Sequence, residues 1–239
     1  MSPRIGTAAW SVPRAVADTF PPGDSLLARY AQVFDAVEIN SSFYRPHRRS
    51  TYERWAATVP DGFRFAVKAP KAITHEKRLV GAQPEIERFL DEAGGLGQTL
   101  GPLLVQLPPS LAFDPQTAAP FFADLRARTP TPVVCEPRHA SWFTADADAL
   151  LREGGVARVA ADPAPVPAAA LCGGWPGLRY TRLHGAPRIY YSDYSSERLA
   201  EVAANLTEAP VESWCIFDNT ALGFATANAL DLRRLLSPG

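Results

Sequence analysis

Hydrophobic residues recur along the chain in short runs that are typical of buried strands. Each run is rich in β-branched or aromatic residues and is bounded by proline, glycine or polar residues, which is the pattern of a strand rather than a long helix. Eight such runs are present, at residues 4–10, 36–40, 63–69, 102–108, 132–138, 157–162, 178–185 and 213–219. The pattern therefore predicts eight strands.

Helical signals fill most of the gaps between these strands. Ser50 and Glu53 have the spacing of a capping box, and Asp114 and Thr144 stand where N-caps of two further helices are expected. Residues 163–177 are too rich in proline and glycine for a regular helix, so an irregular loop or a truncated helix is expected there. The predicted helices lie within residues 25–34, 50–59 and 84–95, after Asp114, and within 145–155, 195–206 and 220–236.

Strand and helix alternate throughout the 239 residues, which matches a (β/α)8 TIM-type barrel of about 250 residues. We expect an α/β fold of this type in a single domain, residues 1–239, with the irregular connection between strands 6 and 7. The alternative is a doubly wound open sheet. Such a sheet would normally bind a nucleotide through a glycine-rich first turn, and GTAAW at residues 6–10 is not G-x-G-x-x-G.

Polar residues stand at the end of nearly every predicted strand. Glu38 and Asn40 lie two positions apart, so their side chains point to the same side while Val37 and Ile39 point to the other. In a TIM barrel the C-terminal ends of the strands form the active-site face, and we expect both polar side chains to point inward there. The corresponding residues of the other strands are Lys68, Gln106, Glu136, Arg138, Asp162, Arg182, His184, Asp218 and Asn219.

Composition and charge exclude several classes of protein. Hydrophobic residues make up 46% of the chain, enough for a large core, and 24 basic against 25 acidic residues provide no overall field for nucleic acid or anionic lipid. Cys135, Cys172 and Cys215 lie far apart without a C-x-x-C pair, which argues against a disulfide framework or a zinc finger. No apolar run approaches the roughly 20 residues of a membrane span, and MSPRIGTAAW lacks the apolar region of a signal peptide. No membrane partner and a cytoplasmic location are expected.

Seven motifs together resemble the DUF72 family, also called YecE-like proteins. They are GTAAW, VEINSSFYRP, FAVKAPKAITH, LVQLPPS, EPRHASWF, RLHG and FDNTALGFATANAL, in this order over essentially the whole chain. The resemblance implies a TIM-barrel-type fold without an established activity. One departure is that family members often have an aromatic residue and two asparagines where this chain has Phe217, Asp218 and Asn219, which leaves the role of Asp218 open. The family's characteristic positions fall on Trp10, Glu38, Asn40, Phe43, Tyr44, Lys68, Thr74, His75, Gln106, Glu136, Arg138, Trp142, Arg182, His184, Gly185 and Asn219.

The charged residues at the strand ends predict a site for a small anionic molecule. Lys68, Arg138 and Arg182 would bind the anion, because arginine presents a planar fork to carboxylate or phosphate. Equally, these cations could pair with the neighbouring carboxylates and leave nothing free. Three cations at one mouth argue against a metal site, and no cofactor is expected. The remaining candidates for substrate contacts are Asn40, Gln106, Asn219, Tyr44, Trp10, His75 and Trp142.

The leading hypothesis is an enzyme that acts on a small anionic or phosphorylated compound by acid/base or hydrolytic chemistry. Glu38 and Glu136 are the candidate acid/base residues and His184 the candidate proton shuttle. A metal-independent hydrolase, lyase or isomerase would fit. One alternative is a nucleic-acid-binding or processing protein that uses the rim aromatics and the basic YRPHRRS segment, and another is a non-catalytic ligand sensor. The sequence contains no feature that predicts an oligomeric state.

Overall fold

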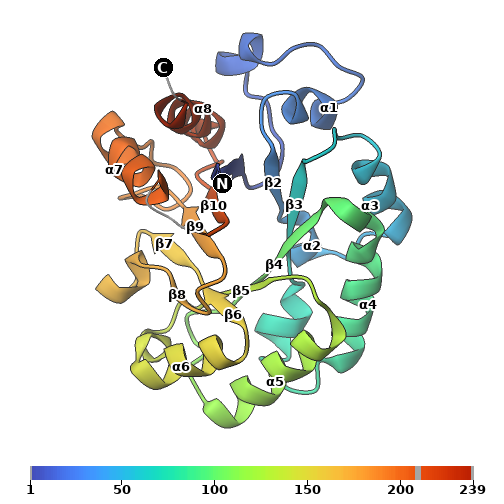
Figure 1. Ribbon diagram of the computed structural model, residues 1–239, viewed down its shortest axis with the longest axis vertical. Coiled ribbons are helices and arrows are strands. Elements are labelled where there is room, and N and C mark those ends of the chain that lie inside the picture. Colours follow the sequence, from blue (N-terminus) through green and yellow to red (C-terminus); the bar gives the residue numbers. More distant parts are fainter. Residues whose placement is uncertain (1, 208–210, 238–239) are drawn as a thin grey trace.

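The computed structural model describes residues 2–207 and 211–237, in which helices lie around a central set of strands (Figure 1). No helix of this part of the chain is both long and apolar enough to cross a membrane. The strands are β1 (Arg4–Thr7), β2 (Ala36–Ile39), β3 (Arg64–Lys68), β4 (Leu100–Gln106), β5 (Val133–Glu136), β6 (Val156–Arg158), β7 (Ala160–Asp162), β8 (Gly173–Gly174), β9 (Arg179–Leu183) and β10 (Ser213–Phe217). The α-helices are α1 (Leu26–Ala31), α2 (Ser41–Tyr44), α3 (Arg49–Ala56), α4 (Gln83–Ala93), α5 (Pro115–Arg128), α6 (Ala145–Glu153), α7 (Ser196–Thr207) and α8 (Phe224–Leu236).

Short helical turns complete the connections. Four of them are 3-10 turns, and the turn after β3 is a single π-helical turn, a form that is often found at functional sites. They are η1 (Arg14–Thr19), η2 (Ala72–Glu76, the π turn), η3 (Gly94–Thr99), η4 (Ala140–Phe143) and η5 (Pro167–Ala170).

The strands pair as two parallel sheets in the order β1-β10-β9-β7 and β2-β3-β4-β5-β6, with the two-residue β8 antiparallel to β6. Each of the eight predicted runs overlaps an observed strand, and the sixth run is divided at Val159 into β6 and β7. The two sheets meet at that division and at an isolated parallel bridge between Ala8 and Glu38. This is the predicted TIM-barrel-type arrangement, although the ladder of described strands is interrupted at these two places.

Two of the predicted helix N-caps are confirmed. Asp114 Oδ1 accepts a hydrogen bond of 3.0 Å from the backbone N–H of Gln116 at the start of α5. Thr144 Oγ1 accepts a bond of 3.3 Å from the backbone N–H of Ala147 at the start of α6. Both side chains satisfy an N–H group that the first turn of a helix leaves without a partner.

The predicted capping box at Ser50 and Glu53 is wrong. Helix α3 begins at Arg49, so its N-cap is Arg48 rather than Ser50, and Arg48 makes no side-chain cap. Glu53 instead pairs with Arg49 one turn before it, with 3.2 Å between Oε1 and Nε. The i,i+4 ion pair therefore uses the carboxylate that a capping box would have required.

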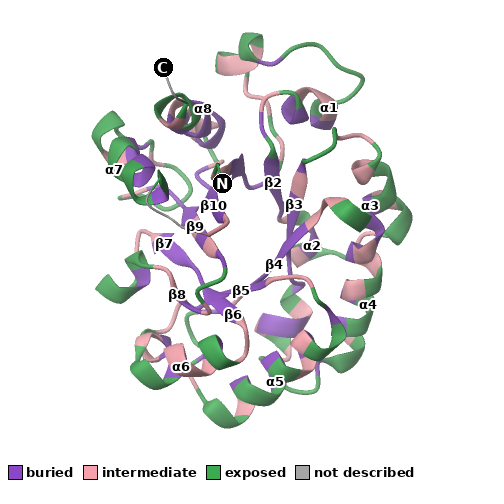
Figure 2. Ribbon diagram, viewed as in Figure 1, coloured by how far each residue is buried: buried purple, intermediate pink, exposed green. Residues whose placement is uncertain are grey.

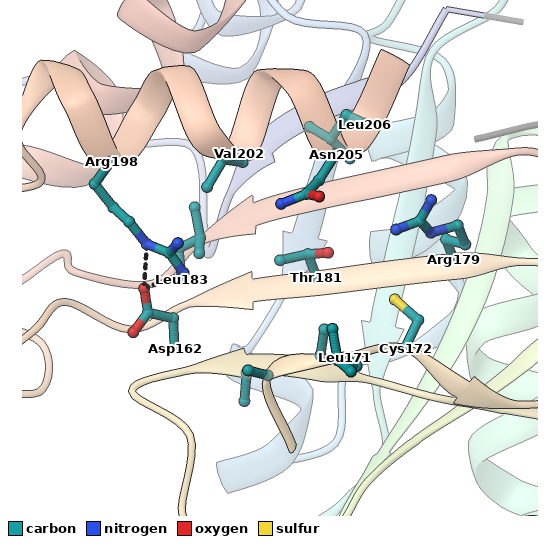
Figure 3. A pocket seen from close by; sticks show the side chains of 13 residues that line it. Asp162, Leu171, Cys172, Arg179, Thr181, Leu183, Arg198, Val202, Asn205 and Leu206 are labelled. Carbon is teal, nitrogen blue, oxygen red and sulfur yellow. Dashed lines mark hydrogen bonds and ion pairs between the residues drawn. The ribbon is translucent and has the colours of Figure 1, made fainter. Parts of the chain in front are cut away.

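The proline-rich connection between the sixth and seventh predicted strands is irregular, as expected, and contains only η5 and β8. Under helix α7, on the outer side of β7 and β9, lies a cavity of about 80 Å³ lined by Cys172 and Thr181, among others (Figure 3). Asp162 also lines it and pairs with Arg198 of α7 at 3.0 Å. Asp162 therefore points away from the inside of the strand ring, contrary to the prediction.

Apolar side chains form two separate clusters, and Figure 2 shows the strands buried between helices. The larger cluster lies between strands and helices and includes Val37 and Ile39, as the alternation predicted. The smaller cluster is formed by the opposite strand faces, among them Tyr180 and Trp214, whose rings stack with centroids 5.8 Å apart. It comprises Ala8, Ala36, Ala66, Leu104, Val134, Ala157, Val159, Leu178, Tyr180, Trp214 and Ile216.

The smaller cluster positions the polar residues. In six strands a member of this cluster is followed two positions later by a polar residue, which must point to the same side. The polar residues therefore form a layer at the C-terminal end of the smaller cluster, which we call the mouth. They are Glu38 on β2, Lys68 on β3, Gln106 on β4, Glu136 on β5, Arg182 on β9 and Asp218 directly after β10. The mouth also includes Asn40, Arg138 and His184, each two positions beyond one of these residues.

Candidate active site

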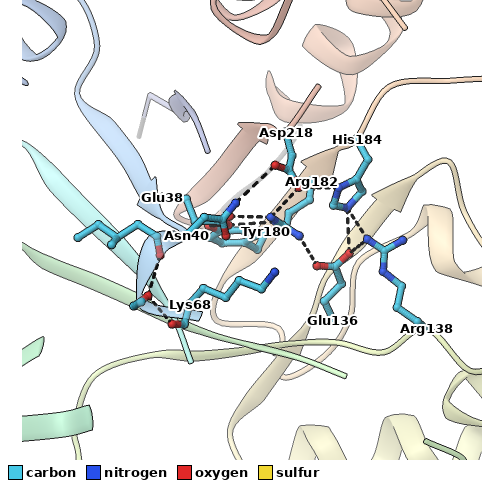
Figure 4. Close-up of polar contacts among 11 residues, drawn as sticks. Glu38, Asn40, Lys68, Glu136, Arg138, Tyr180, Arg182, His184 and Asp218 are labelled. Atoms are coloured by element: carbon cyan, nitrogen blue, oxygen red, sulfur yellow. Dashed lines mark hydrogen bonds and ion pairs between the residues drawn. The ribbon is translucent and has the colours of Figure 1, made fainter. Parts of the chain in front are cut away.

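Arg182 lies at the centre of a buried ionic network in the mouth (Figure 4). Its side chain is 1% exposed and pairs with three carboxylates. The distances are 2.7 Å from Nη2 to Glu38 Oε1, 2.6 Å from Nη1 to Glu136 Oε2 and 3.1 Å from Nη2 to Asp218 Oδ2. The guanidinium fork thus joins three strands and the residue that follows β10, and its donors are largely occupied.

Glu38 is fully buried and has both oxygens bonded. Arg182 Nε donates to Oε2 at 3.0 Å, and the Tyr180 hydroxyl donates to the same oxygen at 2.8 Å. Burial and then the Glu38 carboxylate raise the pKa of Tyr180 well above its usual value, so Tyr180 stays a neutral donor. Tyr180 was not a candidate from the sequence, although its position two residues before Arg182 places it on the same face of β9.

His184 connects two of the carboxylates. Nδ1 lies 2.9 Å from Asp218 Oδ2, and Nε2 lies 2.9 Å from Glu136 Oε1. Nε2 is also 2.6 Å from Arg138 Nη2, and Arg138 pairs with Glu136. A neutral His184 with its proton on Nδ1 can accept from Arg138, whereas a protonated His184 can donate to Glu136, so the ring can hold or pass a proton.

Two carboxyl groups of the network are held in their charged form. Burial acts to raise the pKa of Glu136, but Arg182, Arg138 and His184 outweigh it and hold that pKa well below its usual range. Burial likewise acts to raise the pKa of Asp218, and Arg182 with His184 lowers it below the usual value. Both groups are therefore anions at neutral pH.

Lys68 differs from the other cations of the mouth. The residue is 8% exposed, and Nζ lies 4.2 Å from the centre of the Phe43 ring. Burial, and next the charge of Arg182, lower the pKa of Lys68 to about 8, although the carboxylates of the network act in the opposite direction. Within residues 2–207 and 211–237, Nζ makes neither a hydrogen bond nor an ion pair.

Two further polar atoms of the mouth are buried without a hydrogen-bond partner in the described part of the chain: Arg138 Nε and Asn40 Oδ1. The amide nitrogen of Asn40 makes only a long bond of 3.4 Å to Asp218 Oδ1. The Arg138 side chain keeps 13% of its surface exposed, so it reaches further toward solvent than Arg182.

Three of the predicted substrate-contact residues lie at the edge of this network. The His75 ring is 4.9 Å from the Phe43 ring, and burial followed by the charge of Lys68 lowers the pKa of His75. Tyr44 packs edge-on against Phe43 and is 73% exposed. Gln106 is half-buried and pairs in register with Glu136 across β4 and β5.

Asn219 faces away from the ionic network. Its amide nitrogen donates to the Ser192 carbonyl at 2.9 Å and to Asn228 Oδ1 of α8 at 2.8 Å. Asn219 follows Asp218 directly, so its side chain emerges on the opposite side of the extended chain. The structure thus places it between the loop after β9 and the last helix.

The two predicted tryptophans also lie in packed surroundings. The Trp142 ring N–H donates to the Leu111 carbonyl at 2.9 Å, and the side chain is fully buried in the larger apolar cluster. Trp10 packs edge-on against Trp55 of α3, with ring centres 5.0 Å apart. Neither contact involves the ionic network.

The carboxylates of the mouth are arranged around a guanidinium. Among the described residues, no group of three or more His, Cys, Asp or Glu side chains is placed to hold a metal ion. The oxygens of Glu38 and Glu136 already accept from Arg182, Tyr180 or His184. A cation site would have to compete with these bonds.

Comparisons with known proteins agree with this fold. A family model described as "Protein of unknown function DUF72" matches residues 4–239. The UPF0759 protein YecE of Escherichia coli K12 is 31% identical over 170 residues, which are 69% of this chain and 61% of that protein. The matched region thus spans about three fifths of the length of this relative.

Solved structures give the same result for the architecture. A DUF72 family protein from Enterococcus faecalis V583 has a TM-score of 0.83 at 22% identity, covering 99% of this chain and 96% of that one. One from Thermotoga maritima MSB8 has a TM-score of 0.81 at 25% identity, covering 99% of both chains. 3-Keto-L-gulonate-6-phosphate decarboxylase from Vibrio cholerae, at 9% identity and a TM-score of 0.55, shares the fold alone over 99% of this chain and 98% of its own.

Proposed function

The chain belongs to the DUF72 family, and from the geometry of its mouth we propose an enzyme that acts on a small anionic substrate by acid/base chemistry. One observation carries the proposal: Arg138 Nε and Asn40 Oδ1 are buried atoms without a hydrogen-bond partner in the described chain, and Lys68 Nζ of the same mouth makes neither a hydrogen bond nor an ion pair there. A buried polar group without a partner costs about 1–3 kcal/mol. Native proteins keep few such groups unless a ligand or water satisfies them.

The charges of these groups indicate the kind of ligand. Lys68 Nζ and Arg138 Nε are donors without a partner in the described chain, whereas Arg138 Nη2 pairs with Glu136 and the carboxylates of the network pair with Arg182. Asn40 Oδ1 would accept a bond from a hydroxyl or N–H group. A small molecule with an anionic group and a hydroxyl therefore suits the mouth, and Arg138 is the anchor that stays charged at every working pH.

Lys68 is the group that we expect to exchange a proton with the substrate, because its pKa of about 8 lies close to neutrality. Glu38 and Glu136, the acid/base candidates from the sequence, have their oxygens bonded within the protein. Their proposed role is to position Arg182 and to set the field around Lys68. His184 would be the proton shuttle of the site, since its two ring nitrogens contact the anionic Asp218 and Glu136.

Thermal unfolding with phosphate, sulfate and small phosphorylated compounds tests the anion site. An anion at one hundred times its Kd stabilises by about 2.7 kcal/mol, which raises Tm by several degrees in a chain of this length. The Lys68→Met variant should lose most of the shift. Lys71→Met is the matched control, since Lys71 is half-exposed and pairs with Glu76 at 3.0 Å.

Several results would contradict the proposal. One is an unchanged Tm with every anion, and another is an equal shift in the Lys68→Met variant. A chelator should leave Tm unchanged, and a drop of several degrees would show that a metal holds the mouth together. A protein that binds an anion but converts none of the phosphorylated compounds would be a ligand sensor.

A nucleic-acid ligand is the second candidate function. Tyr44 is 73% exposed, and the neighbouring Arg45 and Arg48 are exposed and make no ion pair in the described part of the chain. An exposed aromatic ring between cations is a platform on which a base can stack. Fluorescence anisotropy with a labelled single-stranded oligonucleotide should show salt-dependent binding that Tyr44→Ala weakens. The absence of binding at low salt would exclude this nucleic-acid function.

A further inference from the structure

Hydrogen bonds hold the backbone at Lys68, and Phe43 packs against the end of its side chain. The Ser42 hydroxyl donates to the Lys68 carbonyl at 2.7 Å, and the backbone N–H of Ala69 donates to the Leu104 carbonyl at 2.8 Å. The side chain is buried, and Nζ lies 4.2 Å from the centre of the Phe43 ring. The side chain is therefore positioned by its backbone and by Phe43, while Nζ itself makes no hydrogen bond or ion pair in the described part of the chain.

Two effects disfavour the ammonium form of Lys68, and three carboxylates favour it. Burial and the charge of Arg182 lower the pKa, while the carboxylates of Glu38, Glu136 and Asp218 raise it, and the result is a pKa of about 8. The neutral amine is then about a tenth of the population at pH 7, a fraction on the order of a hundredfold larger than for an ordinary lysine. Only the neutral amine has the lone pair of a nucleophile.

A proton acceptor lies on the same side of the mouth. The charge of Lys68 acts on His75, whose ring packs edge-on against Phe43. Burial and Lys68 lower the pKa of His75, so this imidazole is neutral at pH 7, holds a proton more weakly than Lys68 does, and would release any proton that it accepts.

We propose that Lys68 is a nucleophile that forms an imine with the carbonyl group of a small anionic aldehyde or ketone. This inference rests on the proposed function, because Arg138 and the unpartnered atoms of the same mouth would hold the anionic group. It adds that the substrate carries a carbonyl carbon within reach of Nζ.

The reaction balances without an oxidant or reductant. The ammonium first loses a proton to His75 or water, and the lone pair of Nζ forms a C–N bond at the carbonyl carbon while the C=O π pair moves to oxygen. A proton moves from nitrogen to that oxygen, and the proton taken up first returns to the resulting hydroxyl, which leaves as water. The products are a protonated imine and one water.

Reductive trapping on the full chain tests the inference. The chain has three lysines, Lys68, Lys71 and Lys77, so the modified positions are easily separated by peptide mapping. With pyruvate and cyanoborohydride, Lys68 should acquire one carboxyethyl group at least about tenfold faster than Lys71 or Lys77, given its larger neutral fraction. Dihydroxyacetone phosphate should be compared with pyruvate, to distinguish a phosphate from a carboxylate as the anionic group.

Matched controls separate the imine from simple anion binding. Lactate has the carboxylate but no carbonyl, so it should shift Tm as pyruvate does and leave no adduct. Lys71→Met should keep the labelling of Lys68, and Lys68→Met should abolish the fast adduct. Acetone, which has no charge, should label Lys68 at least about tenfold more slowly than pyruvate if the anion is bound first, as expected from about 1.4 kcal/mol of anion binding.

The failures of the two proposals can be told apart. Equal labelling of the three lysines, with Tm still raised by pyruvate and lactate, would overturn the imine and leave the anion site standing. Labelling of Lys68 by acetone as fast as by pyruvate, with no anion raising Tm, would overturn both the anionic substrate and the proposed function.

Discussion

Arg182 is the residue on which the ionic network depends. It pairs with Glu38, Glu136 and Asp218 at distances of 2.6 to 3.1 Å. Truncating it to alanine leaves these carboxylates buried without their common partner. Breaking a buried ion pair in this way costs about 3–5 kcal/mol, and we expect Arg182→Ala to lower the free energy of unfolding by that amount in chemical denaturation.

The control for this variant is Arg179→Ala on the same strand. Arg179 lines the outer cavity and makes no ion pair in the described chain, so its loss should change stability by less than about 0.5 kcal/mol. If Arg182→Ala instead kept its stability and lost anion affinity, Arg182 would be a ligand anchor and the pairing described above would not hold in solution.

Lys68 should destabilise the folded protein at neutral pH. Its pKa in the fold is about 8, below the usual value of 10.5, so the unfolded chain binds the proton more strongly. The penalty is complete below about pH 8 and disappears as the pH rises from there to above about 10, and its size is roughly 3 kcal/mol. Lys68→Met should therefore be more stable than the wild type by up to that amount at about pH 7, with a difference that shrinks steadily toward about pH 10.

Denaturation of both proteins between about pH 7 and pH 9.5 measures this difference, and Lys71→Met provides the baseline. A Lys68→Met variant that is less stable at pH 7, or a difference independent of pH, would show that the amine is satisfied in the fold.

The side of each strand was predictable for individual residues, but their partners were not. Alternation alone placed Glu38, Glu136 and Arg182 on the inner face, because each lies two positions from an inner apolar residue. It could not show that one guanidinium would bind the carboxylates of Glu38, Glu136 and Asp218, which depends on distances between strands that are far apart in sequence. Asn219 was misplaced for a local reason: β10 ends at Phe217, and Asn219 lies on the outward side.

At the scale of single elements, the helix caps provide a direct test. Thr144 caps α6, and Ser50 lies exposed inside α3 without capping it. We expect Thr144→Ala to lower the free energy of unfolding by about 1 kcal/mol. Ser50→Ala should change it by less than about 0.5 kcal/mol.

Urea denaturation of the two variants measures both effects. An equal loss in both would mean that α3 begins at Ser50 after all, with the capping box that the sequence spacing suggested.

The strands were the most predictable elements, because each is a short apolar run bounded by proline, glycine or polar residues. The division at Val159 was not visible in ARVAAD, since an apolar residue continues the pattern whether it pairs or not. In the structure, Val159 donates its N–H to the Cys135 carbonyl at 2.9 Å, while β7 pairs with β9. The chain thus changes its pairing partner from β5 to β9 at Val159, and this change depends on tertiary contacts that the local sequence does not show.

At the scale of the whole molecule, the ionic network predicts the behaviour in acid. The pKa values of Glu136 and Asp218 are lowered in the fold, because the nearby cations outweigh burial. Their stabilising contribution is therefore present above about pH 4, the usual range of such groups, and is lost as the pH falls toward the folded values. The free energy of unfolding should drop steeply below about pH 4.

Asp218→Asn should weaken this dependence on pH, since it removes one of the two titrating groups. Asp61→Asn, at an exposed position that makes no ion pair or side-chain hydrogen bond in the described chain, is the control and should follow the wild type. A wild type whose stability is constant from about pH 6 to pH 3 would contradict the charged state of these carboxyls.

Glu38 connects the ionic network to the junction between the two sheets. Its carboxylate binds Arg182, and its own carbonyl accepts the N–H of Ala9 at 2.9 Å, beside the bridge at Ala8 that links the two sheets. A ligand that displaces the Glu38 side chain should therefore also change the hydrogen bond between the Glu38 carbonyl and the Ala9 N–H. The amide resonance of Ala9 becomes a remote reporter: its chemical shift and its rate of hydrogen exchange should change when the mouth is occupied, even though Ala9 itself is an exposed residue in a loop.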